Sequence, residues 1–221
     1  MRLLITFLLL INSLFLYAQN TGTAVSQSKD SQVKDTTFVK SDTSIVPLRQ
    51  IDSTIISDVK YATKNNFTGK VLYPTDKVYL RKLVAEKLSQ VQTYLVEKYN
   101  LRLKVFDGYR PLSVQRKLWE IMPDENFVAN PAKGSRHNRG AAVDLTLIDS
   151  TGNELEMGTP YDDFTKKAYR DYTDFPDNIK NNRKILEEAM VRFGFEPLRS
   201  EWWHFDYSGW KVYSLLDVEI K

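Results

Sequence analysis

The 221-residue sequence contains only two histidines, and each has a carboxylate close by. Asp144 follows His137 by seven residues, and Glu201 precedes His204 by three. Two neutral imidazoles and one carboxylate form a normal catalytic zinc set, which leaves the fourth tetrahedral position for water. Because the sequence has no Cys, histidines and carboxylates must hold any metal. We therefore predict one Zn²⁺ per chain, bound by His137, Asp144 and His204.

Glu201 supplies the second requirement of metal-assisted hydrolysis. A zinc ion lowers the pKa of water to about 7, but a base must still take the proton as the water attacks a carbonyl. Asp144 opens the apolar run 145–147, where a carboxylate is costly unless it is paired or binds a metal. Either histidine alone would more often be structural. Together with the two carboxylates, they indicate a hydrolytic metal site with Glu201 as the general base.

Two helices are predicted from the spacing of apolar residues. A helix over residues 80–98 is expected because apolar side chains recur along one face at Leu80, Val84, Leu88, Val91 and Leu95. A second helix is expected over residues 177–193, with Gly194 as its left-handed terminator.

Short β-type runs separate these helices, and they carry the candidate ligands. Residues 103–106, 141–148 and 203–207 are predicted strands. Strands and helices do not alternate in regular βαβ units, which favours an α+β fold with a small central antiparallel or mixed sheet flanked by helices.

The beginning of the chain differs in composition from the rest. Met1 and Arg2 precede a nearly unbroken apolar run that ends near Ala18, which is typical of a secretory signal peptide over residues 1–19. Residues 20–46 are rich in polar side chains and predict a flexible linker. Residues 47–221 are then one catalytic domain. We expect export to the periplasm or cell envelope, with no membrane span in the mature chain.

The net charge of +3, with acidic and basic residues interspersed, gives no basic stripe of the kind that follows a phosphate backbone. We therefore expect no nucleic-acid partner.

The residues around the candidate ligands also carry a resemblance. Ser-x-His-x-x-Gly-x-Ala-x-Asp over residues 135–144, followed by Glu-x-Trp-His over residues 201–204, resembles the signature of the LAS metallopeptidases. Five further segments resemble those of the VanX-type D-alanyl-D-alanine dipeptidases of peptidase family M15 in their order and approximate spacing. These segments are residues 58–63, 66–69, 107–111, 144–147 and 157–162. The resemblance covers residues 51–207. It implies a hedgehog/DD-peptidase-type fold and zinc-dependent hydrolysis of a small dipeptide substrate, D-Ala-D-Ala or a related D-containing dipeptide.

The resemblance also implies roles for residues outside the metal set. Arg110 would stabilise the oxyanion, Tyr61 and Asp162 would receive the ammonium group of the dipeptide, and Ser135 would face its other end. Each has a structural alternative. Arg110 could simply pair with Asp107, Asp162 could cap a helix, and Tyr61 could be a core aromatic.

Two other functions remain open at this point. A peptidoglycan DD-carboxypeptidase or endopeptidase could use the same metal set in an open cleft, but Tyr61 and Asp162 favour a dipeptide. A non-catalytic zinc-containing module that binds peptides is the third possibility. Glu201 argues against it, because a structural metal site requires no base.

Overall fold

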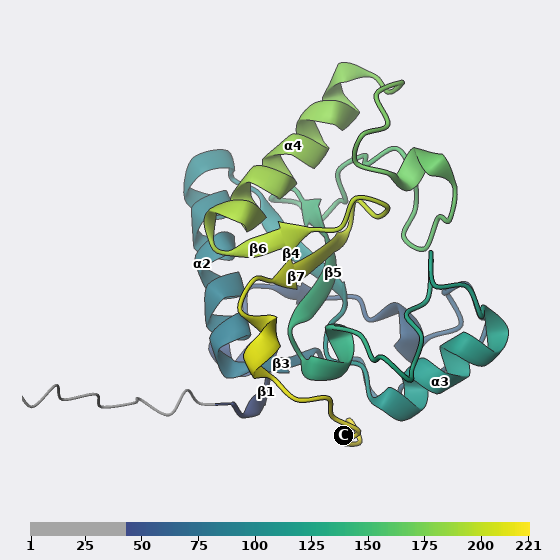
Figure 1. Cartoon of the computed structure of the whole chain (residues 1–221). Coiled ribbons are helices and arrows are strands. Elements are labelled where there is room, and N and C mark those ends of the chain that lie inside the picture. Colours follow the sequence, from purple (N-terminus) through teal and green to yellow (C-terminus); the bar gives the residue numbers. More distant parts are fainter. Residues whose placement is uncertain (1–42) are drawn as a thin grey trace, which may run out of the picture. The chain divides into compact units, whose positions relative to one another are not determined.

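The computed structural model of the chain describes residues 43–221 (Figure 1). The predicted signal peptide, and the predicted linker up to residue 42, lie outside the described residues. The helices, strands and 3-10 helices (η) are β1 (Ile45–Pro47), α1 (Leu48–Ile51), β2 (Ile56–Ser57), η1 (Lys60–Ala62), β3 (Tyr79–Arg81), α2 (Lys82–Tyr99), β4 (Arg102–Asp107), α3 (Leu112–Ile121), η2 (His137–Arg139), β5 (Ala142–Ile148), η3 (Lys166–Ala168), α4 (Asp177–Arg192), β6 (Phe195–Pro197), β7 (His204–Tyr207) and η4 (Trp210–Val212).

The central sheet has five strands in the order β2-β4-β5-β7-β6. β2 pairs with β4 in parallel, and the other neighbours pair antiparallel. A separate two-stranded sheet joins β1 to β3. The structure therefore confirms the predicted α+β class with a small mixed sheet.

The two faces of the central sheet have different surroundings. Helices α2 and α4 contact each other and the sheet on one face (Figure 1). Strand residues alternate between faces, and Val143, Leu145 and Leu147 of β5 belong to the hydrophobic core. Asp144 of the same strand lines a cavity instead. The helices thus cover one face, and the opposite face is left for the functional groups.

Two predicted boundaries are wrong at the beginning of the domain. The helix expected from residue 80 begins at Lys82, because Leu80 lies in β3 and pairs with Val46 of β1. The same pairing corrects the predicted linker, which was expected to reach residue 46, since Ile45 and Val46 are already part of a sheet. A fully buried Leu80 fits the apolar spacing of a helix equally well, so periodicity alone could not separate the two elements.

The other predicted elements lie close to their expected positions. β4, β5 and β7 contain the three predicted strands to within one residue at each end. α4 begins at Asp177 as predicted, and Gly194 beyond its end has the left-handed φ of 91°.

A register shift in β4 positions the chain that follows it. Between Val105 and Asp107, the pairing of β4 with β5 is irregular, and Asp107 then pairs with Asp144. A bulge of this kind bends a strand and redirects its side chains. Here it directs the turn 108–111 toward the sheet face that carries Asp144.

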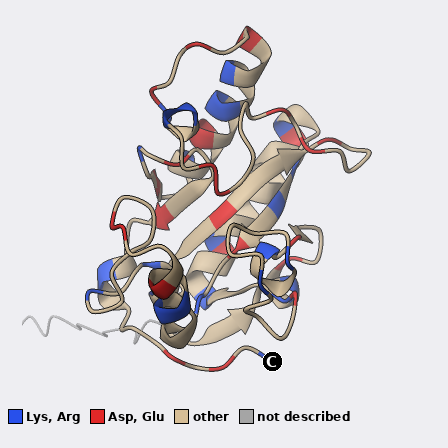
Figure 2. Ribbon diagram, turned by 90° about the vertical axis from the view of Figure 1, so that its right-hand side faces the viewer, with Lys and Arg blue, Asp and Glu red and all other residues tan. Residues whose placement is uncertain are grey.

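Lysines and arginines are interspersed with acidic residues over the described elements (Figure 2). Over residues 43–221, no helix combines the length and apolar character needed to cross a membrane.

Gly140 joins η2 to β5 and has a left-handed φ of 67°. A Cβ at this position would lie 3.2 Å from the backbone nitrogen of Arg81 and from Cδ1 of Ile45. We predict that Gly140→Ala lowers the free energy of unfolding by about 1–2 kcal/mol from backbone strain, with a further loss from crowding. Urea denaturation measures this difference.

Gly69→Ala is the matched control, because Gly69 has a nearly identical φ of 65° and no atom within 4 Å of the added Cβ. Equal losses in the two variants would contradict the crowding that we infer at Gly140.

Candidate active site

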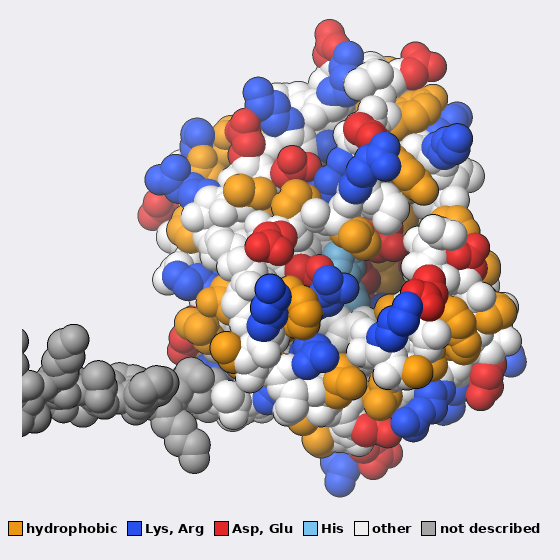
Figure 3. All heavy atoms as spheres, in the orientation of Figure 1, with side chains coloured by type: hydrophobic (Ala, Val, Ile, Leu, Met, Phe, Trp, Pro, Cys, Tyr) orange, Lys and Arg blue, Asp and Glu red, His pale blue; other side chains and the backbone are white. Residues whose placement is uncertain are grey.

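A cavity of about 210 Å³ lies on the sheet face opposite α2 and α4. Its walls include every predicted site residue: Tyr61, Arg110, Ser135, His137, Asp144, Asp162, Glu201 and His204. In Figure 3 a histidine side chain is visible in a hollow near the middle of the molecular face, with acidic and basic side chains around it. The fold therefore brings into one cavity residues that lie as much as 143 positions apart in the sequence.

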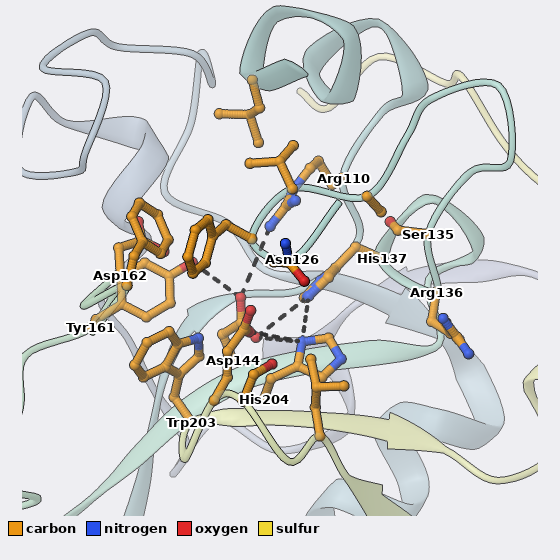
Figure 4. Close-up of a pocket in the computed structure, with 18 of the residues that line it drawn as sticks. Arg110, Asn126, Ser135, Arg136, His137, Asp144, Tyr161, Asp162, Trp203 and His204 are labelled. Atoms are coloured by element: carbon orange, nitrogen blue, oxygen red, sulfur yellow. Dashed lines mark hydrogen bonds and ion pairs between the residues drawn. The ribbon is translucent and has the colours of Figure 1, made fainter. Parts of the chain in front are cut away.

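His137, Asp144 and His204 form a tight cluster of possible metal ligands. Nε2 of His137 lies 3.2 Å from Nδ1 of His204 and 3.4 Å from Oδ1 of Asp144. Nδ1 of His204 lies 2.9 Å from the same carboxylate oxygen. Figure 4 shows these three side chains converging at the centre of the cavity.

A second contact fixes the orientation of each candidate ligand. Nδ1 of His137 donates to the carbonyl oxygen of Gly108 at 2.7 Å, and Nε2 of His204 donates to Oδ1 of Asp206 at 3.0 Å. The hydroxyl of Tyr161 donates to Oδ2 of Asp144 at 3.0 Å. Such outer partners set the tautomer of metal-binding histidines and the direction of the ligand. They leave Nε2 of His137, Nδ1 of His204 and Oδ1 of Asp144 facing one another.

This arrangement fits a zinc ion. Nitrogen and oxygen ligands lie about 2.0–2.1 Å from a tetrahedral zinc, so two of them lie about 3.3 Å apart. The three measured separations, 2.9, 3.2 and 3.4 Å, are close to that value. The donor set also matches a catalytic site with three protein ligands and one open position.

The carboxylate and the imidazoles of the cluster shift one another's pKa values. Burial alone would raise the pKa of Asp144, but His137 and His204 hold this pKa well below its usual range. Burial alone would lower the pKa of His204, yet Asp206 and Asp144 raise it to about 10. A metal ion bound by the imidazole of His204 would therefore have to displace a proton from it.

Glu201 lies beside the cluster, with its Oε2 3.9 Å from Nδ1 of His204. Only 15% of its side chain is exposed, and burial raises its pKa to about 7. A carboxyl group that titrates near neutral pH can both accept and return a proton under ordinary conditions.

Arg110 forms the ion pair of its structural alternative and also lines the cavity. Its Nε and Nη2 donate to Oδ2 of Asp107 at 3.0 and 2.7 Å, and its Nη1 donates to Oε1 of Gln115 at 3.0 Å. The predicted pairing with Asp107 is therefore present. The guanidinium still lines the cavity, and its Nη2 lies 3.9 Å from Oδ2 of Asp144. Asp107 and Gln115 thus hold the guanidinium facing the cluster of candidate metal ligands.

Tyr61 and Asp162 meet at one end of the cavity. The Tyr61 hydroxyl donates to Oδ2 of Asp162 at 3.2 Å, and burial raises the pKa of Asp162 well above its usual value. Asp162 has a left-handed φ of 59°, which is uncommon for a residue with a side chain and is concentrated at functional sites. The capping alternative does not hold for Asp162, because Asp163 accepts the local turn hydrogen bond from Thr165.

Ser135 lies at another part of the cavity wall, and only 8% of its surface is exposed. Its hydroxyl accepts a hydrogen bond from the backbone of Asn138, and its own backbone nitrogen donates to the Asn138 side chain. These two bonds hold the turn that carries His137.

The comparison with known proteins identifies the family of this site. Residues 41–216 match the peptidase M15 family, described as D-ala-D-ala dipeptidase. The chain belongs to peptidase family M15. It is similar to D-alanyl-D-alanine dipeptidase of Escherichia coli K12, with 34% identity over 174 residues that cover 79% of this chain and 90% of the relative. It also resembles the enzyme of that name from Enterococcus faecalis, with 30% identity, covering 67% of this chain and 83% of the relative. The family that the motifs indicated is thereby confirmed.

Several contacts of this M15 site were not predicted from the sequence. Asp206 could have been found, because it lies two residues after His204 in a strand and so shares its face. Tyr161 is next to the predicted Asp162, but nothing in the sequence connects it with Asp144. The carbonyl of Gly108 gives no sequence signal, since a backbone group exists at every position.

Zinc binding to this M15 site should depend on pH because a metal needs His204 in its neutral form. Since the pKa of His204 in the metal-free protein is about 10, zinc must displace its proton at neutral pH. We predict that zinc affinity rises about tenfold per pH unit between pH 6 and 8 for each proton displaced. Competition titrations against a chelator of known pH dependence measure this. An affinity that does not change with pH would contradict the assignment of His204.

Asp206→Asn should weaken zinc binding by about 10- to 100-fold, because the variant keeps the shape but loses the charge that orients His204. Glu196→Gln is the matched control, since Glu196 pairs with Asp206 across the strands but is exposed. The same chelator competition reports both variants. Equal zinc affinity in the wild type and Asp206→Asn would show that this hydrogen bond does not support the metal ligand.

Proposed function

We propose that this chain is a zinc-dependent dipeptidase that hydrolyses D-Ala-D-Ala and related D-containing dipeptides to free amino acids. The observation that carries this proposal is the presence, in one cavity, of the three-ligand cluster, Glu201 and the buried carboxyl group of Asp162. The similar proteins named D-alanyl-D-alanine dipeptidase support it.

The metal ligands and Glu201 would share the hydrolytic step. When bound by His137, Asp144 and His204, zinc would polarise the scissile carbonyl and acidify a water molecule. Glu201 takes the proton of the attacking water and then gives it to the leaving amine. Burial raises the pKa of Glu201 above its ordinary value, which favours a carboxyl group that accepts a proton and later returns it.

Arg110 stabilises the negative charge that develops on the carbonyl oxygen. The guanidinium is permanently charged, and Asp107 and Gln115 fix its direction before the substrate arrives. A group that is already oriented requires no rearrangement as the charge forms.

Asp162 and Tyr61 recognise the free ammonium group of the dipeptide. A buried carboxyl group whose pKa is raised lacks a compensating cation, and a substrate ammonium would provide one. An acylated amine carries no charge and cannot do so. This requirement selects dipeptides over the ends of longer chains, which distinguishes the proposed activity from that of a DD-carboxypeptidase.

We also propose that the enzyme acts outside the cytoplasm, in the periplasm or cell envelope. The apolar run near the N-terminus, which follows Arg2 and ends near Ala18, supports export. Immunodetection of the mature protein in a periplasmic fraction tests this, and its retention in the cytoplasm would contradict it.

The activity itself is tested with a panel of dipeptides of defined stereochemistry, with and without a chelator. We predict release of free alanine from D-Ala-D-Ala by the zinc-loaded protein and loss of this activity with the chelator. Glu201→Gln should lower kcat by about 10²- to 10⁴-fold while zinc remains bound, because the variant removes the proton acceptor and keeps the ligands.

Glu125→Gln is the matched control, because Glu125 also lines the cavity but is exposed and forms an ion pair with Lys133. If the protein releases no alanine from D-Ala-D-Ala but removes the terminal D-Ala from a pentapeptide stem, the proposed function is wrong and the protein is a carboxypeptidase.

A further inference from the structure

The substrate of the proposed function has a charge at each end, and so far only the ammonium end has been given a partner of opposite charge. Asp162 accounts for the ammonium group. The terminal carboxylate needs a cation, and the cavity wall includes two guanidinium groups, Arg110 and Arg136. Arg110 already donates to Asp107 and Gln115 through all three of its nitrogens. Arg136 is therefore the stronger candidate for the substrate carboxylate.

Arg136 is fixed in place on two sides. Its Nε lies 3.4 Å from Oδ2 of Asp206, and its guanidinium carbon lies 4.7 Å from the centre of the Trp210 ring. The ion pair engages Nε, which leaves the two Nη groups for a ligand. About half of the side chain, 47%, is exposed, so a substrate can reach it.

Arg136 also lies on the side of the ligand cluster opposite to Asp162 (Figure 4). Figure 4 shows Asp162 on one side of the cluster of His137, Asp144 and His204, and Ser135 and Arg136 on the other. A dipeptide whose ammonium contacts Asp162 and whose peptide carbonyl lies at the cluster would direct its carboxylate toward Arg136. Guanidinium and carboxylate groups form paired, charge-assisted hydrogen bonds.

We propose that Arg136 binds the C-terminal carboxylate of the dipeptide and thereby selects substrates with a free carboxyl end. This inference rests on the proposed dipeptidase function. Asp206 contacts both Arg136 and the ligand His204, so the same carboxylate orients the metal ligand and the carboxylate-binding group.

The experiment compares D-Ala-D-Ala with its neutral analogue D-Ala-D-alaninamide, using zinc-loaded wild type, Arg136→Met and Arg136→Lys. We expect Arg136→Met to lower kcat/KM for the acid by about 10- to 100-fold, mainly through KM, because a charged hydrogen bond is lost. The amide should change by less than about threefold, since it offers no charge to the guanidinium. Arg136→Lys should recover part of the loss.

Two controls separate this effect from general damage. Lys133→Met removes a cation from the same loop that does not line the cavity, and it should leave the ratio of acid to amide unchanged. The zinc content of the Arg136 variants must equal that of the wild type, because Arg136 contacts Asp206, which is hydrogen-bonded to the candidate ligand His204. Calorimetric binding of D-Ala-D-Ala to Glu201→Gln, with and without Arg136→Met, gives a readout that does not depend on turnover.

The outcomes distinguish the inference from the function on which it rests. If the wild type hydrolyses D-Ala-D-Ala and Arg136→Met keeps the wild-type ratio of acid to amide, the inference is wrong and the dipeptidase function stands. Equal hydrolysis of acid and amide by the wild type also overturns it. If the wild type hydrolyses neither compound, both proposals fail together.

Discussion

The antiparallel pairing of β5 with β7 is the constraint on which the site depends. It places Asp144 directly opposite His204, so that two candidate metal ligands share one face of the sheet. A shift of one residue would send one of them into the helix-covered core, because side chains alternate along a strand. Apolar neighbours oppose that shift, since Val143 and Phe205 pair at the next position and are fully buried on the other face. Hydrophobic burial of these neighbours therefore maintains the register that the polar cluster requires.

The third ligand and the outer contacts come from turns next to these strands. The bulge in β4 brings the 108–111 turn close enough for Gly108 to accept a hydrogen bond from His137. The same turn carries Arg110, which Asp107 holds. Two buried carboxylates, Asp107 and Asp144, and the Arg110 guanidinium near two imidazoles would be costly in an apolar interior. Their mutual pairing offsets this cost in the metal-free protein, and it leaves the inner face of the cluster suited to a divalent cation.

The chemistry of the site could be predicted from the sequence more completely than its geometry. His137, Asp144, His204 and Glu201 were identifiable because the chain has only two histidines and no cysteine, and each histidine has a carboxylate nearby in the sequence. The structure brings all four into one cavity. The long helices and the buried strands also follow from periodicity. The strand β3 was missed because Leu80 fits a helix pattern equally well. Helix α3 was not predicted. Strands β2 and β6 have only two and three residues, which are too few to show the alternation of apolar and polar side chains. Contacts such as that of Tyr161 with Asp144 depend on tertiary packing and have no local signal.

We propose that one zinc ion is held by one side-chain atom each of His137, Asp144 and His204. The most direct test is a crystal structure of the zinc-loaded protein with anomalous diffraction recorded at the zinc edge. We predict one anomalous peak per chain, about 2.0–2.2 Å from Nε2 of His137, Nδ1 of His204 and Oδ1 of Asp144. A zinc peak next to the opposite nitrogen of either histidine, or at another position in the chain, would contradict this assignment. Active protein without any zinc peak would also contradict it.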